Sequence, residues 1–386
     1  MLGKILSDKL FHRLDHIETG TLQLTTPDGR TRVFSGRNPG ESAQIKLHDW
    51  SVISNMVQKG DVGFAEDYRA GNWETDNLTA LTTLGLINRT ALDSFVAGHS
   101  FFRRLSMLSY LLRMNSLKGS KKNIHAHYDL GNDFYKLWLD PSMTYSAAIF
   151  KSQDESLETA QHNKYDRIID CLNNHSGNLL EVGCGWGGFA ERALENQDLN
   201  IKGITLSEEQ HSFSQKRLGE RAEIALEDYR HQDGKYDNIV SIEMFEAVGE
   251  QYWQTYFKKI GALLSTKGKA VIQTITMNDH DFSRYRQGGD FIRTYIFPGG
   301  MLPSPSRFRA ETLKSGLKSQ NAFYFGHDYA TTLERWLYCF DHKTPEIKEL
   351  GFDDGFIRLW RFYLASCIAG FRTGRINVMQ VELSHV

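Results

Sequence analysis

The pattern of apolar and polar residues changes character along the chain. Residues 21–36 alternate between the two kinds on either side of a Pro-Asp-Gly turn at 27–29, which predicts a β-hairpin. Residues 43–50 have the composition of a further strand, and helical spacing follows, with a break at Gly71. Together these elements predict a small α+β module over residues 1–95.

From Leu179 onward, strand patterns and helix patterns alternate. The predicted strands cover 179–182, 201–205, 222–228, 236–245 and 269–275, with helical segments between them. Alternation of this kind is typical of a parallel sheet covered by helices on both faces. The C-terminal part adds two strand patterns, within 321–336 and 376–386, around a helical stretch rich in aromatic residues.

A basic amphipathic segment separates these two regions. The stretch FFRRLSMLSYLLRMNSLKGSKK, residues 101–122, mixes apolar residues with arginine and lysine and contains no acid. Such a segment can lie on an anionic membrane surface, or it can be a linker helix whose cations face water. Both readings place a linker over residues 96–122, between the N-terminal module and a larger domain.

The composition narrows the choice of function. Lys and Arg number 45 against 47 Asp and Glu, and this net charge of −2 argues against a protein that coats nucleic acid. The four cysteines form no C-x-x-C pair and the fourteen histidines show no metal-ligand spacing, so we expect a reducing compartment and no metal. The sequence contains no run of about 20 apolar residues, which is the length needed to span a bilayer. We expect a cytoplasmic protein, soluble or peripheral to the membrane.

A glycine-rich stretch follows the predicted strand that begins at Leu179. Gly183, Gly185, Gly187 and Gly188 stand where the first strand of a doubly wound sheet turns into a helix, which is where such sheets bind ligands. Glycine lets the backbone approach a bulky ligand. A dinucleotide site would place an acid at the end of the next strand, whereas this chain has Thr205 there.

The stretch EVGCGWGG, residues 181–188, resembles the first motif of class I S-adenosylmethionine (SAM) methyltransferases. Further motifs resemble, in order, those of the cyclopropane-fatty-acid synthases and the related mycolic-acid methyltransferases: HYDLGNDFYKLWLDPSMTYS (127–146), GITLSEEQ (203–210), MFEAVG (244–249), YIFPGGMLPS (295–304), FGHDYATTL (325–333) and AGFRTGRINVMQV (369–381). The resemblance covers about residues 120–386, and the N-terminal module is similar to the extra domain of bacterial members that act on phospholipids. It implies a Rossmann-like catalytic domain over 123–386 with a mixed seven-stranded sheet.

The resemblance also implies which residues contact SAM. The positions that match the family's cofactor contacts are Tyr145, Ser146, Gly183, Gly185, Thr205, Gln210 and Asp228. Each has a purely structural alternative: an aromatic at 145 can be core, a serine at 146 can cap a helix and a threonine at 205 suits a strand. Their joint occurrence at matching positions favours the cofactor site.

The family's chemistry is attack of an alkene on the methyl carbon of SAM, followed by loss of a proton. The resemblance implies that a bound bicarbonate takes this proton, held by a cysteine, a glutamate, a histidine, a backbone amide and a tyrosine. The glutamate, amide and tyrosine correspond to Glu246, Ile275 and Tyr329, but the cysteine position is Ala147 and the histidine position is Gln273.

These two departures leave bicarbonate open as a ligand. If the ion binds, the amide of Gln273 and the backbone N–H of Ala147 would help to hold it. If it does not, we expect a methyl-branched or methylene chain in place of a cyclopropane. Glu243 is then a spare carboxylate near SAM, although a solvated acid or one facing the SAM amine is the plainer interpretation.

We therefore expect a SAM-dependent enzyme that adds a methyl or methylene carbon to the double bond of unsaturated acyl chains in membrane phospholipids. It would work at the inner face of the membrane and without nucleic acid, and a homodimer is left open. The alternatives are a fatty-acid C-methyltransferase without ring closure, an N-methyltransferase, a non-catalytic lipid-binding protein and a dinucleotide oxidoreductase. An N-methyltransferase would be favoured by histidine directly after Glu246, where this chain has Ala247.

Overall fold

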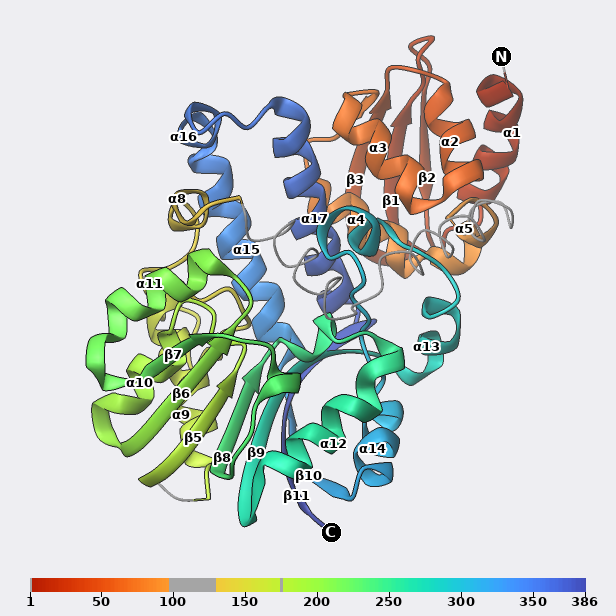
Figure 1. Cartoon of the computed structure of the whole chain (residues 1–386). Coiled ribbons are helices and arrows are strands. Elements are labelled where there is room, and N and C mark those ends of the chain that lie inside the picture. The colour runs from red at the N-terminus through yellow and green to blue at the C-terminus, as the bar shows by residue number, and fades with distance from the viewer. Residues whose placement is uncertain (1, 97–129, 174–175) are drawn as a thin grey trace. The chain divides into compact units, whose positions relative to one another are not determined.

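The computed structural model describes residues 2–96, 130–173 and 176–386 (Figure 1). Their contacts divide the chain into two compact units. The first unit holds the described N-terminal residues up to 96 together with 284–296 and 336–375, and the second holds 130–283, 297–335 and 376–386 as far as they are described. The predicted linker, apart from its first residue, lies outside the described residues.

The first unit contains a four-stranded sheet in the order β2-β1-β3-β4. Strands β1 (Thr19–Thr25) and β2 (Thr31–Ser35) pair antiparallel around the Pro-Asp-Gly turn, which confirms the predicted hairpin. Strand β3 (Asn38–Leu47) begins five residues before the predicted strand and runs parallel to β1. The short β4 and five helices complete this part of the unit: β4 (Trp73–Glu74), α1 (Leu2–Leu14), α2 (Ser51–Lys59), α3 (Asp61–Ala70), α4 (Leu78–Ile87) and α5 (Arg89–Val96).

Helices from the C-terminal part of the sequence pack into this first unit. In α17 (Asp354–Arg372), the Phe362 ring lies 6.1 Å from Phe64 of α3, and the Ala365 carbonyl accepts a hydrogen bond of 3.2 Å from Thr82 of α4. The sequence places this helix in the predicted catalytic domain over 123–386, because apolar spacing shows that a face is buried and not which unit buries it. The same unit includes the end of α15 (Gly326–His342), α16 (Thr344–Glu349) and η5 (Ile292–Ile296).

The second unit is built on a seven-stranded sheet in the order β10-β11-β9-β8-β5-β6-β7. Strands β5 to β9 run parallel, whereas β11 pairs antiparallel with both β9 and β10. The predicted mixed seven-stranded sheet is thereby confirmed. Its strands are β5 (Ser176–Val182), β6 (Asp198–Thr205), β7 (Glu223–Leu226), β8 (Tyr236–Ile242), β9 (Leu264–Met277), β10 (Leu317–Tyr324) and β11 (Ile376–His385).

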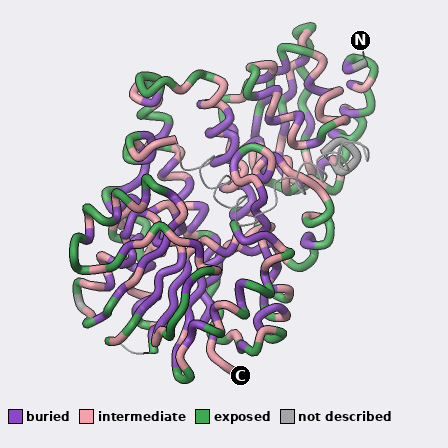
Figure 2. The backbone as a smooth tube through the Cα atoms, in the orientation of Figure 1, coloured by how far each residue is buried: buried purple, intermediate pink, exposed green. Residues whose placement is uncertain are grey.

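Helices flank this sheet and bury its central strands. The strand residues Leu179, Val240 and Val271 are at most 1% exposed, and the purple course of the central strands in Figure 2 follows the same core. Burial on both faces explains why these strands read as continuous apolar runs. The surrounding helices and turns are α8 (Asn132–Lys136), α9 (Leu157–Asp170), α10 (Gly188–Asn196), α11 (Glu208–Leu218), η1 (Gly219–Arg221), η2 (Tyr229–His231), η3 (Phe245–Ala247), η4 (Glu250–Tyr252), α12 (Trp253–Leu263), α13 (Asp279–Tyr285) and α14 (Pro305–Lys314).

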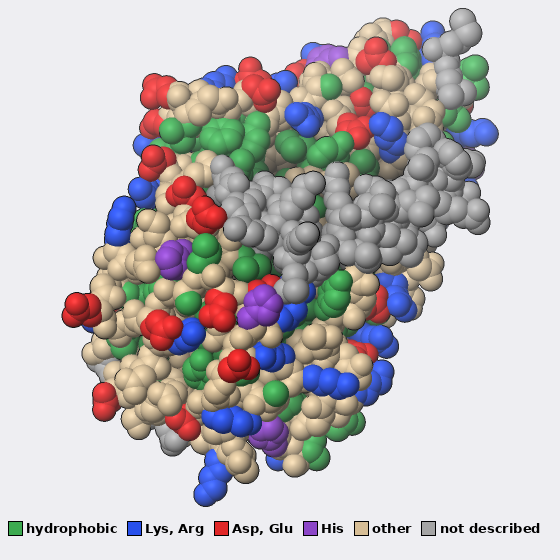
Figure 3. Space-filling model, in the orientation of Figure 1, with side chains coloured by type: hydrophobic (Ala, Val, Ile, Leu, Met, Phe, Trp, Pro, Cys, Tyr) green, Lys and Arg blue, Asp and Glu red, His purple; other side chains and the backbone are tan. Residues whose placement is uncertain are grey.

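The described surface carries charges of both signs. On the face drawn in Figure 3, acidic and basic side chains are interspersed, and neither sign forms a continuous field there. Among the described helices, none is both long and apolar enough to pass through a bilayer. The described residues also contain no cluster of three metal-binding side chains.

Candidate active site

The glycine-rich turn joins β5 to α10 in a backbone conformation that favours glycine. Gly183, Gly185 and Gly187 have φ values of +84°, +53° and +82°. A side chain at Gly183 would come within 2.9 Å of Met244, whereas one at Gly185 would meet no protein atom within 4 Å. The backbone at Gly185 therefore borders open space, as a turn that wraps a ligand requires.

This turn forms one wall of a pocket at the carboxyl ends of β5, β6 and β8. Its other walls come from the loop at 143–146 and from the starts of the following helices. Six of the seven residues predicted to contact SAM line it: Tyr145, Ser146, Gly183, Gly185, Thr205 and Gln210. Asp228 lies between two lining residues, Glu227 and Tyr229. Its carboxylate is paired with Arg230 at 2.6 Å and caps η2.

At the end of β6 the pocket wall is polar but holds no carboxylate. The Thr205 hydroxyl donates to Oε1 of Gln210 at 2.8 Å, and Ser207 caps α11 by accepting from the backbone N–H of Gln210. These bonds fix the Gln210 side chain against the strand end. The end of β6 therefore carries Thr205 and Gln210, and not the Asp or Glu that a dinucleotide site would place there.

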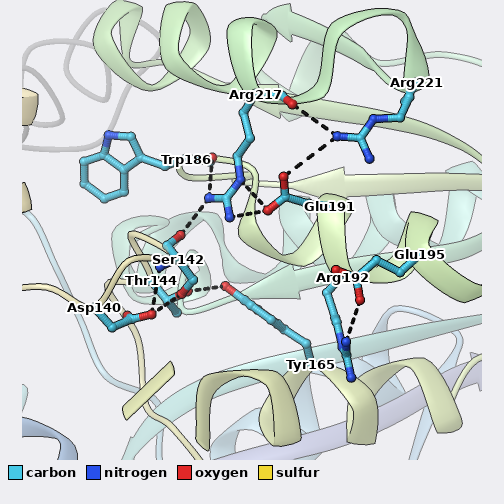
Figure 4. A network of polar contacts seen from close by, with 10 residues as sticks. All are labelled: Asp140, Ser142, Thr144, Tyr165, Trp186, Glu191, Arg192, Glu195, Arg217 and Arg221. Carbon is cyan, nitrogen blue, oxygen red and sulfur yellow. Dashed lines mark hydrogen bonds and ion pairs between the residues drawn. The ribbon is translucent and has the colours of Figure 1, made fainter. Parts of the chain in front are cut away.

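The loop that carries Tyr145 and Ser146 is tied to the glycine turn (Figure 4). Arg217 of α11 donates to the carbonyl of Ser142 at 2.7 Å and to that of Trp186 at 3.3 Å. The hydroxyls of Thr144 and Tyr165 are 2.8 Å apart. Because Arg217 also pairs with Glu191 of α10, the loop, the turn and the helix are held as one frame.

Among the described residues, the pocket wall contains acidic side chains and no lysine or arginine. The wall contains the carboxylates of Glu181, Glu227 and Glu243. Glu181 is 2% exposed, burial raises its pKa well above the usual range, and its Oε2 receives no hydrogen bond from the described residues. The buried Lys164, whose pKa burial lowers, donates to Ser146 Oγ at 2.7 Å. The carboxyl oxygens of this wall can accept hydrogen bonds from the ammonium group of SAM.

The carboxylate of Glu243 collects three hydrogen bonds. Its Oε1 accepts from the backbone N–H of Ala147 at 2.9 Å and from the amide of Gln273 at 2.7 Å, and its Oε2 accepts from the Tyr329 hydroxyl at 2.6 Å. Burial is the largest influence on this carboxyl and raises its pKa, against the three donors and the charge of Lys164. Glu243 is half-buried and lines the pocket, so the expectation that it is a solvated acid or faces the SAM amine stays a prediction.

Glu246, three residues further on, has fewer donors. Its Oε1 accepts from the backbone N–H of Ile275 and, at 3.0 Å, from the hydroxyl of Thr274, while Oε2 has no donor among the described residues. Burial, followed by repulsion from Glu243, raises the pKa of Glu246 to about 8. Of the five residues matched to the bicarbonate site, Glu246 is thus one of these two carboxylates and the other four donate hydrogen bonds to one or the other.

Gln380 and Arg167 fix the orientation of the Gln273 amide. Gln273 and Gln380 are directly opposed on β9 and β11, and Nε2 of Gln380 donates to Oε1 of Gln273 at 2.9 Å. Oε1 of Gln380 in turn accepts from Arg167 at 2.6 Å. Since its oxygen is occupied, Gln273 must turn its NH2 group toward Glu243.

A mixed seven-stranded Rossmann-like sheet with a ligand pocket at its glycine turn is the arrangement found in class I SAM-dependent methyltransferases. The structure is similar to that of the mycolic acid cyclopropane synthase CmaA1 complexed with SAH and CTAB, with a TM-score of 0.64 and 32% identity over 68% of this chain and 97% of that chain. More narrowly, the chain belongs to the mycolic acid cyclopropane synthetase family, whose model matches residues 115–381.

Two curated relatives match nearly the whole chain. The tuberculostearic acid methyltransferase UfaA1 of Mycobacterium tuberculosis is 36% identical over 94% of this chain and 87% of its own length. The cyclopropane-fatty-acyl-phospholipid synthase of Escherichia coli is 34% identical over 90% of this chain and 89% of its own length. The family predicted from the motifs, the methyltransferase activity and SAM as methyl donor are confirmed.

Three residues of the pocket and its support, Glu181, Lys164 and Gln380, were not singled out from the sequence. Glu181 stands inside the quoted EVGCGWGG motif, so its place next to the glycines was an available signal. Lys164 lies on α9 with no motif around it, and only the fold brings it beneath Ser146. Gln380 is part of a quoted motif, but its role depends on strand register, which the sequence does not specify.

Proposed function

We propose that this methyltransferase transfers the methyl carbon of SAM to the double bond of an unsaturated acyl chain carried by a membrane phospholipid. The observation that carries the proposal is the extent of the match. The relatives named for fatty-acyl-phospholipid and tuberculostearic acid match 90% and 94% of this chain, whereas the mycolic acid synthase matches 68%. Most of the first unit is thus shared with the relatives named for a fatty-acyl-phospholipid and for tuberculostearic acid.

The pocket residues divide the work of such a reaction. Gly183, Gly185, Thr205 and Gln210 would hold SAM, with Glu181 facing its positive charge. Bound there, SAM supplies an electrophilic methyl carbon. Attack by an alkene leaves a cation on the acyl chain, and the lining rings of Tyr145, Tyr165, Trp186 and Tyr229 can stabilise a nearby cation by about 0.5–2 kcal/mol each.

The reaction is tested with the full chain, SAM and vesicles of mono-unsaturated phospholipid. We expect the acyl chains to gain the mass of one methylene group, and matched vesicles of saturated phospholipid to gain nothing. Vesicles with anionic and with neutral headgroups, run in parallel, report the surface preference expected for an enzyme at the inner face of the membrane. Methylation of free fatty acid but not of phospholipid would contradict the proposed substrate.

A further inference from the structure

We propose that the carboxylate of Glu243 takes the place of bicarbonate in this enzyme and is itself the base that removes the proton, a role that builds on the function proposed above. The site would then need no external anion. Glu246, the residue that matches the family's glutamate, would stay as a neighbouring acid with its backbone and hydroxyl donors.

The donors expected around bicarbonate are already engaged by Glu243. The Ala147 N–H, the Gln273 amide and the Tyr329 hydroxyl all stand at positions matched to the bicarbonate site, and all three donate to this one carboxylate at 2.6–2.9 Å. A carboxylate and a bicarbonate ion present the same pair of oxygens on one carbon. A second anion would have to displace Glu243 from these donors and sit beside its charge.

The side-chain amide of Gln273 is oriented so that its NH2 group donates to Glu243. Its oxygen is held by Gln380, which is held by Arg167, so that a chain of three donors points from the guanidinium toward Glu243. A histidine at this position could donate or accept according to its tautomer. Glutamine locked in this way can only donate, which suits a permanent carboxylate partner.

The backbone at Glu243 keeps a side chain where glycine would be less strained. Its φ is +50°, in the left-handed region, and its N–H is fixed by the Gln273 carbonyl at 2.8 Å. Strained residues of this kind persist where the surroundings hold them and are concentrated at functional sites. The conformation places the carboxylate between the donors and the pocket.

Glu243 and Glu246 also differ in their position relative to the pocket. Glu243 lines the pocket together with its neighbours Ile242 and Met244, whereas Glu246 is not among the lining residues. A base must come within hydrogen-bond reach of the proton that it removes. Glu243 is therefore within reach of a group bound in this pocket.

The step balances without a further reagent. The alkene's π pair forms the bond to the methyl carbon, and the pair of the broken C–S bond stays on sulfur. The acyl cation then loses a proton to the Glu243 carboxylate, and the C–H pair becomes either a double bond or the closing bond of a ring. Glu243 ends as a neutral acid and returns its proton to water.

The test compares wild type with Glu243→Gln and Glu243→Gly. In buffer freed of carbon dioxide, wild type should turn over as fast as with added bicarbonate, and Glu243→Gln should be at least about a hundredfold slower. Glu243→Gly suits the positive φ and opens the anion site, so bicarbonate should restore its turnover in a saturable manner. By NMR, ¹³C-bicarbonate should bind Glu243→Gly and not wild type.

Calorimetry with SAH and thermal melting separate this role from a structural one. Both glutamate variants should bind SAH within a few-fold of wild type, and Asn321→Gly, which relieves another positive φ outside the pocket, should behave as wild type throughout. Bicarbonate that binds or accelerates wild type, or a Glu243→Gln variant within tenfold of wild-type turnover, would overturn the proposal. If wild type methylates no unsaturated lipid, the proposed function fails. The NMR experiment with bicarbonate still decides whether Glu243 or bicarbonate occupies the anion site.

Discussion

The glycine-rich turn and the carboxylate of Glu243 border the same pocket but are built in different ways. The turn is a run of neighbouring residues that acts through its backbone at Gly183 and Gly185. The Glu243 site is assembled from side chains and an amide that are 30, 86 and 96 positions away. A ligand site made of consecutive residues keeps its signature in the sequence, whereas a site made by the fold can change its chemistry through single substitutions.

The largest expected effect separates the two regions by affinity. In Gly185→Val, the new side chain would enter the open space beside the turn and force a branched residue into φ +53°. We expect SAH affinity to fall by about a hundredfold or more, which corresponds to roughly 3 kcal/mol. Calorimetry measures it, with Gly234→Val, an open glycine at positive φ outside the pocket, as the control for backbone strain. Equal SAH affinity in wild type and Gly185→Val would remove this turn from the cofactor site.

The pH dependence of stability sharpens the contrast within the carboxylate region. Because the pKa of Glu246 is raised from 4.5 to about 8, the folded protein holds a proton between these values that the unfolded chain has released. Its contribution to stability is complete below pH 4.5 and is lost as the pH rises toward 8, by at most about 1.4 kcal/mol per unit. Glu246→Gln carries no such proton, so its free energy of unfolding should gain on wild type from pH 5 to pH 8.

Denaturant unfolding at pH 5, 6.5 and 8 measures this difference. Glu74, an exposed acid paired with Lys46 on the surface of the first unit, is the control: Glu74→Gln should show no gain over the same range. A constant difference between Glu246→Gln and wild type would mean that folding does not raise the pKa of Glu246 in this range.

The sequence predicted the parts of the molecule that depend on neighbouring residues. Alternation of strands and helices indicated the sheet, and the glycines located the pocket, because both are local patterns. It did not show that α17 packs with α3 and α4, since spacing does not name a partner. Nor did it give the role of Glu243, because that role depends on a positive φ and on donors from three other segments.

The smallest expected effect tests the support behind the carboxylate. Gln380→Met keeps the length of the side chain but removes the donor that holds the Gln273 oxygen, so that the amide can rotate away from Glu243. The loss of one such oriented hydrogen bond is worth about 1 kcal/mol, and turnover should fall roughly five- to tenfold. SAH affinity should stay unchanged, because Gln380 does not line the pocket. Gln320→Met on the exposed β10 is the control and should leave turnover as in wild type. If Gln380→Met instead weakened SAH binding and left turnover intact, the relay from Arg167 would serve the cofactor half of the pocket, and the division between the two regions would not hold.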